Sequence, residues 1–283
     1  MATQPDPAPY GSGAPAPRPS RVSVATLAKM ARDGERIAML AAYDASFAAI
    51  CDRVGVDVLL VGDSLGMVVQ GHPSTLPVTL EDTLYHVRAV LRGCMRPLVI
   101  ADLPFGSFQG GADEAWRASV AAMKAGAQMV KIEGGAMMAP TVEYLTRRGV
   151  PVCGHVGLLP QSVNVLGAYR VQGKSSPEAA EALLADARAL AEAGAPMLVV
   201  ECVPRALGAA LTASVEVPVI GIGAGPDCSG QVLVVYDAIG IQPGKPARFV
   251  RNFLAGRDSV EAALAAFVAA VKDGSFPGPE HCF

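Results

Sequence analysis

Short aliphatic runs without polar alternation recur along the chain, and the stretches between them carry helix-like patterns. The run Val58-Leu59-Leu60-Val61 has no polar face, so it predicts a strand that is covered on both sides. Similar runs predict strands at 36–43, 56–61, 97–102, 128–133, 150–155, 197–202 and 217–223, with a less regular eighth at 231–238. Amphipathic or Ala-rich segments predict helices at 23–34, 45–54, 80–92, 113–125, 137–148, 177–193, 205–213 and 259–271.

This alternation of strand and helix is compatible with two α/β architectures. Eight strands at this spacing favour a (β/α)8 TIM barrel preceded by an N-terminal helix. A doubly wound open sheet is the alternative, but the first strand-to-helix turn, Tyr43-Asp44-Ala45-Ser46, has no Gly-rich dinucleotide motif. We therefore expect a single barrel domain over 21–283, with its functional side chains at the carboxyl ends of the strands.

Composition limits the classes of function that remain. Hydrophobic residues make up 51% of the 283 positions and charged residues 17%, which is enough for a large core. A net charge of -3 without a basic stripe argues against a nucleic-acid partner, and no apolar run reaches membrane-spanning length. Six cysteines without a Cys-x-x-Cys pair indicate a reducing cytoplasm. The Pro- and Ala-rich residues 1–20 predict a disordered tail.

Carboxylates end three successive strands of the predicted barrel. Asp63, Asp102 and Glu133 follow strands two, three and four, so a barrel brings them together on one side of its mouth. Three nearby carboxylates repel one another unless a cation or a proton intervenes. Oxygen ligands without cysteine, or histidine at metal-ligand spacing, favour a hard ion, with Mg²⁺ as the first choice. The alternative for each acid is a helix cap or an ion pair with arginine.

Other polar residues lie at strand ends as well. Lys131 points to the same side as Glu133, and an inward lysine needs an anion, either a carboxylate or a substrate. Glu201 is expected across the barrel in an aliphatic setting, where burial raises a pKa and suits the group to proton transfer, unless loop amides bind it. His155 and Ser64 are candidates for substrate contact. A lone histidine more often has a structural role in its loop, whereas Ser64 is as compatible with capping its loop as with binding a ligand.

Together these groups suit one type of reaction. A 2-oxo acid chelates a metal ion through its carboxylate and keto oxygens, and the metal stabilises the enolate that forms when a neighbouring proton leaves. That enolate attacks a one-carbon electrophile or reverses a C–C cleavage. The residues alone predict metal-assisted carbon–carbon chemistry on a 2-oxo acid, and no narrower reaction.

The motifs and their order resemble the ketopantoate hydroxymethyltransferase family over 23–283. The blocks that carry the resemblance are AAYDASFA (41–48), VGDSLGMVVQGHPSTLPVT (61–79), YHVRAVLRG (85–93), ADLPFGS (101–107), MVKIEGG (129–135), PVCGHVGLLPQSVN (151–164), VQGK (171–174), VVECVP (199–204), VIGIGAG (219–225) and PGPEHCF (277–283). Two positions depart from the family pattern, where Ala168 replaces a usual glycine and Lys174 a frequent arginine. Both fall in the loop after strand five, so they affect loop detail and not the expected chemistry.

The resemblance implies a fold, an activity and an assembly. The fold is a barrel of the phosphoenolpyruvate/pyruvate type that uses Mg²⁺. The activity is the transfer of a hydroxymethyl group from 5,10-methylenetetrahydrofolate to 3-methyl-2-oxobutanoate, which gives 2-dehydropantoate and begins the route to pantothenate. The assembly is a homo-oligomer, commonly a decamer of two five-membered rings.

The resemblance also implies roles for the candidate residues around the substrate. Asp63 and Asp102 match the metal ligands of the family, and both lie where the oxo acid binds. Ser64 and Lys131 match further residues that contact the oxo acid, with His155 close by.

The resemblance assigns two further acids to the chemistry itself. Glu133 matches the acid that holds the metal ion through water, and Glu201 matches the catalytic acid or base. These roles agree with those that the strand-end positions suggest.

Two other interpretations remain open at this point. A lyase or mutase of the same barrel group, acting on isocitrate or phosphoenolpyruvate, is expected to carry a reactive cysteine in a Cys-Gly-His loop, and Cys153-Gly154-His155 offers one. No Arg-rich phosphate pocket accompanies it. A catalytically inactive ring-forming scaffold is the other, but it requires the loss of an acid, and Glu201 and the strand-end acids are all present.

Overall fold

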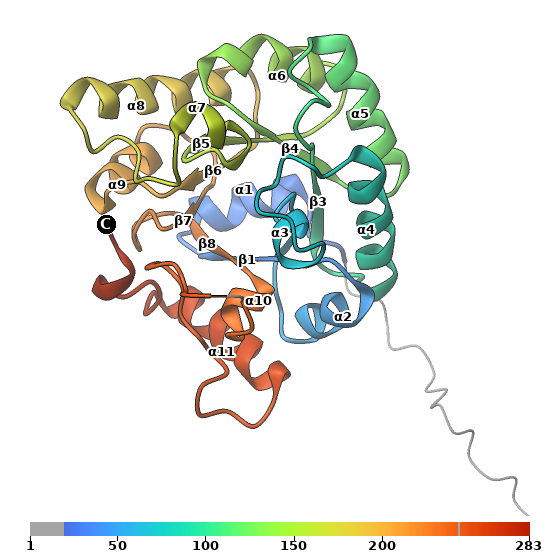
Figure 1. The fold of residues 1–283 in the computed structure, drawn as a ribbon, viewed down its shortest axis with the longest axis vertical. Coiled ribbons are helices and arrows are strands. Elements are labelled where there is room, and N and C mark those ends of the chain that lie inside the picture. Colours follow the sequence, from blue (N-terminus) through green and yellow to red (C-terminus); the bar gives the residue numbers. More distant parts are fainter. Residues whose placement is uncertain (1–19, 243) are drawn as a thin grey trace, which may run out of the picture.

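Eight parallel strands close into a barrel in the order in which they occur in the sequence (Figure 1). The computed structural model describes residues 20–242 and 244–283. The strands are β1 (Ile37–Ala41), β2 (Val58–Val61), β3 (Leu98–Asp102), β4 (Met129–Glu133), β5 (Val152–Gly157), β6 (Met197–Glu201), β7 (Val219–Ile222) and β8 (Gly230–Val234). The predicted (β/α)8 barrel is therefore confirmed, with β8 pairing with β1 to close it.

Helices surround the barrel and short helical turns lie in its loops (Figure 1). The longer helices are α2 (Ala45–Arg53), α4 (Leu80–Gly93), α5 (Ala112–Lys124), α6 (Ala139–Thr146), α8 (Pro177–Glu192), α9 (Arg205–Ala213) and α11 (Val260–Asp273). The short ones are α3 (Leu65–Val68), α7 (Val163–Leu166), α10 (Val235–Ala238), η1 (Ala136–Met138), η2 (Pro160–Ser162) and η3 (Pro279–His281). No helix in the described ranges is both long and apolar enough to cross a membrane.

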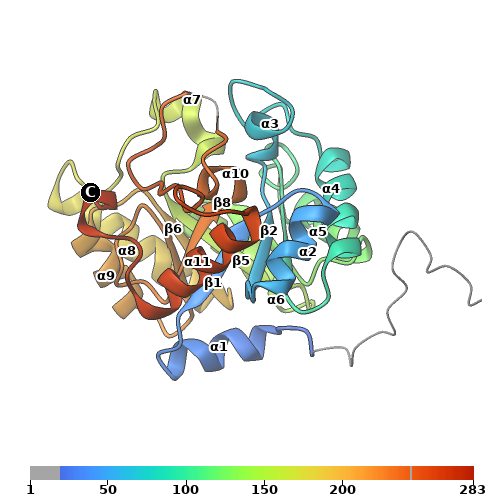
Figure 2. The same ribbon diagram turned by 90° about the horizontal axis from the view of Figure 1, so that it is seen from below.

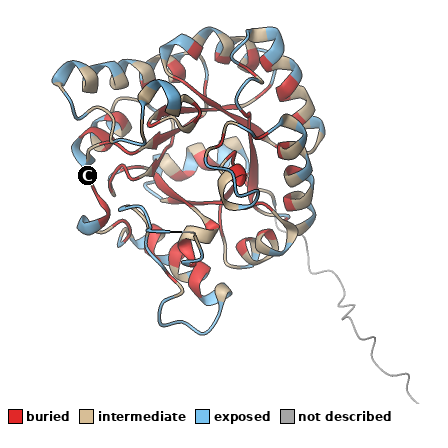
Figure 3. Ribbon diagram, in the orientation of Figure 1, coloured by how far each residue is buried: buried red, intermediate tan, exposed pale blue. Residues whose placement is uncertain are grey.

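Two apolar layers hold the fold together. One lies between the strands and the outer helices, and the other fills the barrel interior with side chains such as Met39, Ile100 and Met129. Figure 3 shows the strands buried along their length, whereas the helices expose their outer faces. Strands buried on both faces explain why the sequence shows aliphatic runs and not alternation.

The N-terminal helix α1 (Val24–Arg32) covers one end of the barrel. It begins at a capping box in which the side chains of Ser23 and Thr26 each bond the other's backbone N–H. Figure 2 shows α1 at the end opposite α3 and α7, and its Leu27 and Met30 join the apolar interior of the barrel. The loops that follow the strands are therefore left as the open, functional end.

The charged residue Asp57 is buried near the α1 end and is fully partnered. Its carboxylate lies 2.7 Å from Arg96 and 2.7 Å from Lys272, and it accepts a hydrogen bond of 3.0 Å from the N–H of Ala38. Those partners compensate its desolvation, so this acid is structural.

The structure corrects two element boundaries. The strand expected at 231–238 ends at Val234, and its second half is the helical turn α10, because the chain has reached the open end of the barrel there. The helix expected at 137–148 begins as the 3₁₀ turn η1 and ends at Thr146. The predicted tail at 1–20 lies, except for Ser20, outside the described residues.

Candidate active site

The parallel register brings the predicted residues side by side at the open end of the barrel. Asp102 on β3 is paired with Lys131 on β4, and Glu133 on β4 is paired with His155 on β5. Glu201 is the last residue of β6, where it is paired with the end of β5. Strands that run in one direction thus place these functional groups in one neighbourhood, as the strand-end rule predicts.

Lys131 is the cation at the centre of the acidic cluster. Its Nζ lies 2.7 Å from Oδ1 of Asp102, 3.5 Å from Oε1 of Glu133 and 3.4 Å from Nδ1 of His155. Burial opposes the charge, but the surrounding carboxylates outweigh it and raise the pKa of Lys131 above its ordinary range. The lysine is therefore a permanent positive charge in a pocket of carboxylates.

Asp63 is the carboxylate of the cluster with the least compensation. Its N–H donates to Oδ2 of Asp102 at 3.1 Å, and its own Oδ2 accepts from Nε2 of Gln161 at 3.0 Å. Burial, with the nearby charges of Asp102 and Glu133, raises the pKa of Asp63 well above its ordinary value. Burial also raises the pKa of Asp102, although Lys131 offsets part of that effect.

Gln161 is a member of the cluster that sequence reasoning did not single out. It lies in η2 after β5, and its backbone N–H donates to Oε2 of Glu133 at 3.0 Å. Its side chain also donates to the carbonyl of Leu103 at 2.9 Å, besides its bond to Asp63. The only available signal was its place in the long loop after strand five, which does not fix where a side chain points.

His155 connects the acidic cluster to Glu201. Its Nδ1 lies 3.4 Å from Oε1 of Glu133, and its Nε2 lies 3.3 Å from Oε2 of Glu201. Burial and the Lys131 ammonium oppose a charge on the ring, but the two glutamates outweigh them and raise the pKa of His155 to about 9. Glu201 was expected across the barrel, whereas the structure places it one imidazole ring away from Glu133.

The backbone on either side of the site is held in specific conformations. Cys202, directly after Glu201, has a φ of 49°, and no other non-glycine residue among those described has a positive φ. Such a conformation is strained and persists only where the surroundings enforce it. Ser64 begins α3, and its hydroxyl lies 2.8 Å from the hydroxyl of Tyr43, so one of its hydrogen bonds is structural.

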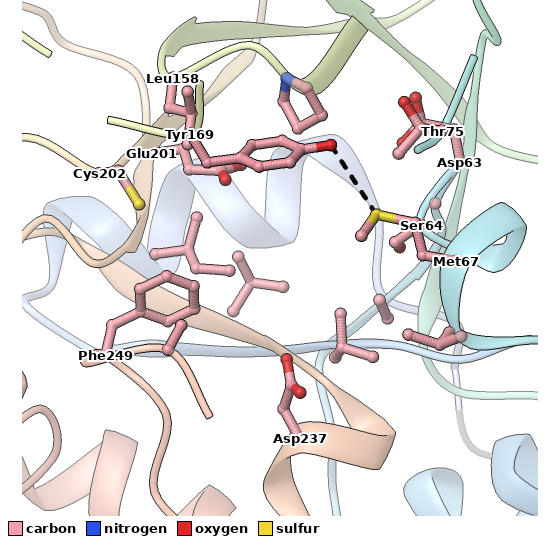
Figure 4. A pocket seen from close by; sticks show the side chains of 18 of the residues that line it. Asp63, Ser64, Met67, Thr75, Leu158, Tyr169, Glu201, Cys202, Asp237 and Phe249 are labelled. Atoms are coloured by element: carbon pink, nitrogen blue, oxygen red, sulfur yellow. Dashed lines mark hydrogen bonds between the residues drawn. The ribbon is translucent and has the colours of Figure 1, made fainter. Parts of the chain in front are cut away.

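A cavity of about 840 Å³ opens onto these residues. All seven predicted site residues line it, namely Asp63, Ser64, Asp102, Lys131, Glu133, His155 and Glu201. Figure 4 shows Glu201 and Tyr169 on one side of the cavity, Asp63 and Ser64 on another, and Asp237 across from Tyr169. The volume is within the range of cavities that bind drug-sized ligands, so it holds more than one small oxo acid.

The residues of the proposed metal site supply suitable oxygen atoms, but they are not arranged around a common point as metal ligands. Among the described residues, no three His, Cys, Asp or Glu side chains are arranged to hold a metal ion. However, Oδ1 of Asp102 and Oε1 of Glu133 are buried without a well-formed hydrogen bond. Three carboxylates face one lysine, and burial together with the charges of Asp102 and Glu133 raises the pKa of Asp63. These oxygen donors fit a hard divalent ion, and Asp63 and Asp102 are in direct contact because the N–H of Asp63 donates to Oδ2 of Asp102.

Cys153 is placed where it cannot serve as a reactive thiol. It is fully buried in the apolar interior of the barrel, outside the cavity lining. Burial raises the pKa of its thiol to about 12, whereas a nucleophilic cysteine needs a lowered pKa. The interpretation as a cysteine-dependent lyase therefore loses the residue on which it depended.

Comparison with known proteins gives one family. The family model described as ketopantoate hydroxymethyltransferase matches residues 21–279. A 3-methyl-2-oxobutanoate hydroxymethyltransferase of Azoarcus sp. (strain BH72) is 59% identical over 263 residues, which is 93% of this chain and 97% of that protein. The protein of the same name from Thiobacillus denitrificans is 58% identical over 262 residues, covering 93% and 99%.

Solved structures share the fold at low sequence identity. A putative phosphonomutase from Burkholderia cenocepacia is similar with a TM-score of 0.62 at 18% identity, over 78% of this chain and 95% of that one. A 2,3-dimethylmalate lyase, described as a member of the PEP mutase/isocitrate lyase superfamily, gives 0.57 at 17% identity over 78% and 84%. These likenesses show that the same barrel fold occurs in those proteins.

Proposed function

The chain belongs to the ketopantoate hydroxymethyltransferase family, and on that premise we propose how its residues carry out the reaction. The activity is that of a 3-methyl-2-oxobutanoate hydroxymethyltransferase, which catalyses the first step of pantothenate biosynthesis. The substrates are 3-methyl-2-oxobutanoate and 5,10-methylenetetrahydrofolate. The observation that carries the residue assignments is the cluster of polar side chains at the carboxyl ends of β2 to β6. These side chains line one cavity together with Glu201, which forms no ion pair with Lys131.

The oxo acid binds beside Lys131. Its carboxylate is an anion, and the buried ammonium of Lys131 is the positive charge that faces the cavity floor. The hydroxyl of Ser64 and the ring of His155 contact its other oxygen atoms. Asp63 and Asp102 would hold a Mg²⁺ ion, and Glu133 would support it. When bound, the metal polarises the keto oxygen and so makes the neighbouring C–H acidic.

Glu201 removes the proton from C3 of the oxo acid. Its side chain is 17% exposed, against 1% for Asp102 and 3% for Glu133, so it reaches the substrate while those carboxylates are occupied. The raised pKa of His155 favours its protonated form, and its Nε2 lies 3.3 Å from the Glu201 carboxylate, so the imidazolium attracts that carboxylate. Water adds to the methylene carbon of methylenetetrahydrofolate, and both C–N bonds break to release formaldehyde and tetrahydrofolate. C3 then attacks the formaldehyde carbon, and the formaldehyde oxygen takes up the proton held by Glu201 and becomes the new hydroxyl group.

Substitution of Glu201 tests the proton transfer directly. Glu201→Gln keeps the shape of the side chain and removes the base, so kcat is expected to fall about 10²- to 10⁴-fold with a smaller change in KM. Exchange of the C3 proton of 3-methyl-2-oxobutanoate in D₂O, followed by NMR without folate, is expected to fall in parallel. Glu181→Gln, at an exposed position of α8, is the matched control. Wild-type exchange and turnover in Glu201→Gln would show that another group is the base.

The assembly and compartment are also proposals. We infer a cytoplasmic homodecamer in which residues 21–283 of each chain form one barrel domain. Several large apolar side chains are exposed, including Met137 at 83% and Val165 at 90%, and subunit contacts would cover them. All six cysteines are buried and unpaired, as in a reducing compartment. Light scattering is expected to give about 290 kDa for ten chains of 29.0 kDa, and a mass of one chain would exclude the decamer.

A further inference from the structure

Asp237 is a carboxyl group on the cavity wall that the reaction above does not use. It lies in α10, directly after β8, and lines the same cavity as the acidic cluster. Figure 4 shows its carboxylate pointing from α10 into the cavity, on the wall facing Tyr169 and Asp63. Within the described residues, no group forms a hydrogen bond or an ion pair with its side chain. Burial alone raises its pKa, to about 6.

Gln242 is a second, independent indication that this part of the cavity binds a ligand. It follows α10 by four residues and lines the same cavity. Its Oε1 is buried and accepts no hydrogen bond from the described part of the chain. A buried acceptor without a donor is costly, so the Gln242 oxygen in the cavity lining, together with the unpartnered Asp237 carboxylate, indicates that a bound molecule supplies the donors.

The charge of the wall determines which substrate it suits. The oxo acid is an anion, and the Asp237 carboxylate repels it, whereas Lys131 attracts it to the far side of the cavity. A flat, neutral group with two adjacent N–H donors suits the wall instead, because the two oxygens of a carboxylate accept such a pair together. The 2-amino-4-oxopyrimidine edge of a reduced pterin has this arrangement in its ring N3–H and its 2-amino group.

We propose that Asp237, assisted by Gln242, binds the pterin of methylenetetrahydrofolate through its N3–H and 2-amino groups; this rests on the function proposed above. The assignment places the folate opposite the oxo acid, with the one-carbon unit between them. Phe249 and Tyr169 also point into the cavity and offer aromatic faces to the ring (Figure 4).

The cavity mouth suits the other end of the same molecule. Arg170 and Lys245 line the cavity and are exposed, and neither forms an ion pair with any residue that the structure describes. The glutamate tail of folate carries carboxylates, so these cations are well placed to attract it as it leaves the cavity. A folate has both features, because its pterin edge is neutral and carries N–H donors, and its glutamate tail is anionic. One folate molecule could therefore contact Asp237 and the cations at the mouth together.

The test compares tetrahydrofolate with its 2-desamino analogue as inhibitors of the wild-type enzyme and of Asp237→Asn. The analogue lacks one of the two donors, so its inhibition constant on the wild type is expected to be on the order of 10- to 100-fold weaker. Asp237→Asn is expected to raise the KM for methylenetetrahydrofolate by a similar factor and to lose most of the discrimination between the two inhibitors. The KM for 3-methyl-2-oxobutanoate is expected to stay within about twofold.

Controls separate binding from folding and from the proposed function itself. Asp258→Asn makes the same chemical change at an exposed position outside the cavity, and Gln242→Met removes the second acceptor alone. If the wild type binds the 2-desamino analogue as tightly as tetrahydrofolate, the assignment is overturned, whether or not any variant folds. Loss of oxo-acid affinity equal to the loss of folate affinity would overturn it too. C3 exchange without folate reports on the proposed function separately, because no folate takes part in it.

Discussion

At the scale of single residues, the ionised carboxylate of Asp237 destabilises the folded chain at neutral pH. Burial raises the pKa of Asp237 to about 6 from an ordinary 3.8, so the folded chain holds this proton more tightly than the unfolded chain. Its contribution to stability is therefore complete below about pH 3.8 and is lost as the pH rises through about 6. At neutral pH the ionised carboxylate, close to the buried Tyr43, is a net cost.

The raised pKa of Asp237 predicts how Asp237→Asn changes the stability of the fold. The amide does not ionise, so the variant is expected to be more stable than the wild type at about pH 7.5, by about 1–2 kcal/mol after discounting for partial exposure. The advantage is expected to vanish near pH 4. Urea unfolding at both pH values measures it, with Asp258→Asn as the comparison. A variant that is less stable at pH 7.5 would mean that the carboxylate has a partner in the fold.

The same scale shows what the sequence could predict about the site. Asp102, Lys131 and Glu133 were found because they stand in or at the ends of strands, where pleat and direction fix a side chain. Gln161 and Asp237 lie in a 3₁₀ turn and a single helical turn, whose conformations depend on tertiary contacts. Local pattern carries no information on such contacts, so these two residues had no signal beyond their polarity.

At the scale of elements, glycines decide how closely neighbouring strands approach. Gly157 ends β5 with a φ of 95°, and a Cβ there would lie 2.2 Å from the carbonyl oxygen of Glu201. That oxygen also accepts a hydrogen bond of 2.8 Å from the N–H of Leu158. A side chain at 157 would therefore push β5 away from the strand end that positions the catalytic base.

Gly157→Ala is consequently expected to damage catalysis beyond its effect on the backbone. The matched control is Gly149→Ala, where φ is 86° and no atom lies within 4 Å of the added Cβ. The control is expected to cost about 1 kcal/mol through the positive φ alone, with near-normal kcat. Gly157→Ala is expected to cost several times more and to lower kcat at least about tenfold, because Glu201 moves. Equal effects of the two variants on kcat and unfolding would show that the contact is not important.

The eighth strand shows where element prediction failed and why. Residues 231–238 are almost uniformly apolar or β-branched up to Tyr236, which is a strand-like composition. The strand stops at Val234 because its pairing partner β1 ends there at Ala41, and beyond it the chain has no neighbour to bond. The unpaired segment turns into α10 and so directs Asp237 at the cavity. The residue types predict a strand here, but its length is set by its pairing with β1 in the closed barrel.

At the scale of the whole molecule, the closed barrel makes strands that follow one another in the sequence neighbours in space. Strands β2 to β6 are neighbours in the ring, so polar residues at their tips, about 140 positions apart from first to last, share one cavity. That convergence could be predicted from the alternation of strands and helices alone. The position of Glu201 next to His155 could not, because it depends on the strand register and on the strained backbone at Cys202.

The proposed metal site can be tested on the intact protein without measuring activity. A ligand that binds only the folded state raises the free energy of unfolding, by about 2.7 kcal/mol at a hundredfold excess over its dissociation constant. For a chain of this size each kcal/mol shifts Tm by about 2–4 °C, so Mg²⁺ is expected to raise Tm in proportion to the logarithm of its concentration. Asp63→Asn removes a charge from the pair with raised pKa values and is expected to abolish the shift, whereas Asp258→Asn keeps it. An identical shift in both variants would place the ion elsewhere, and no shift in the wild type would mean that Lys131 and His155 balance the carboxylates without a metal ion.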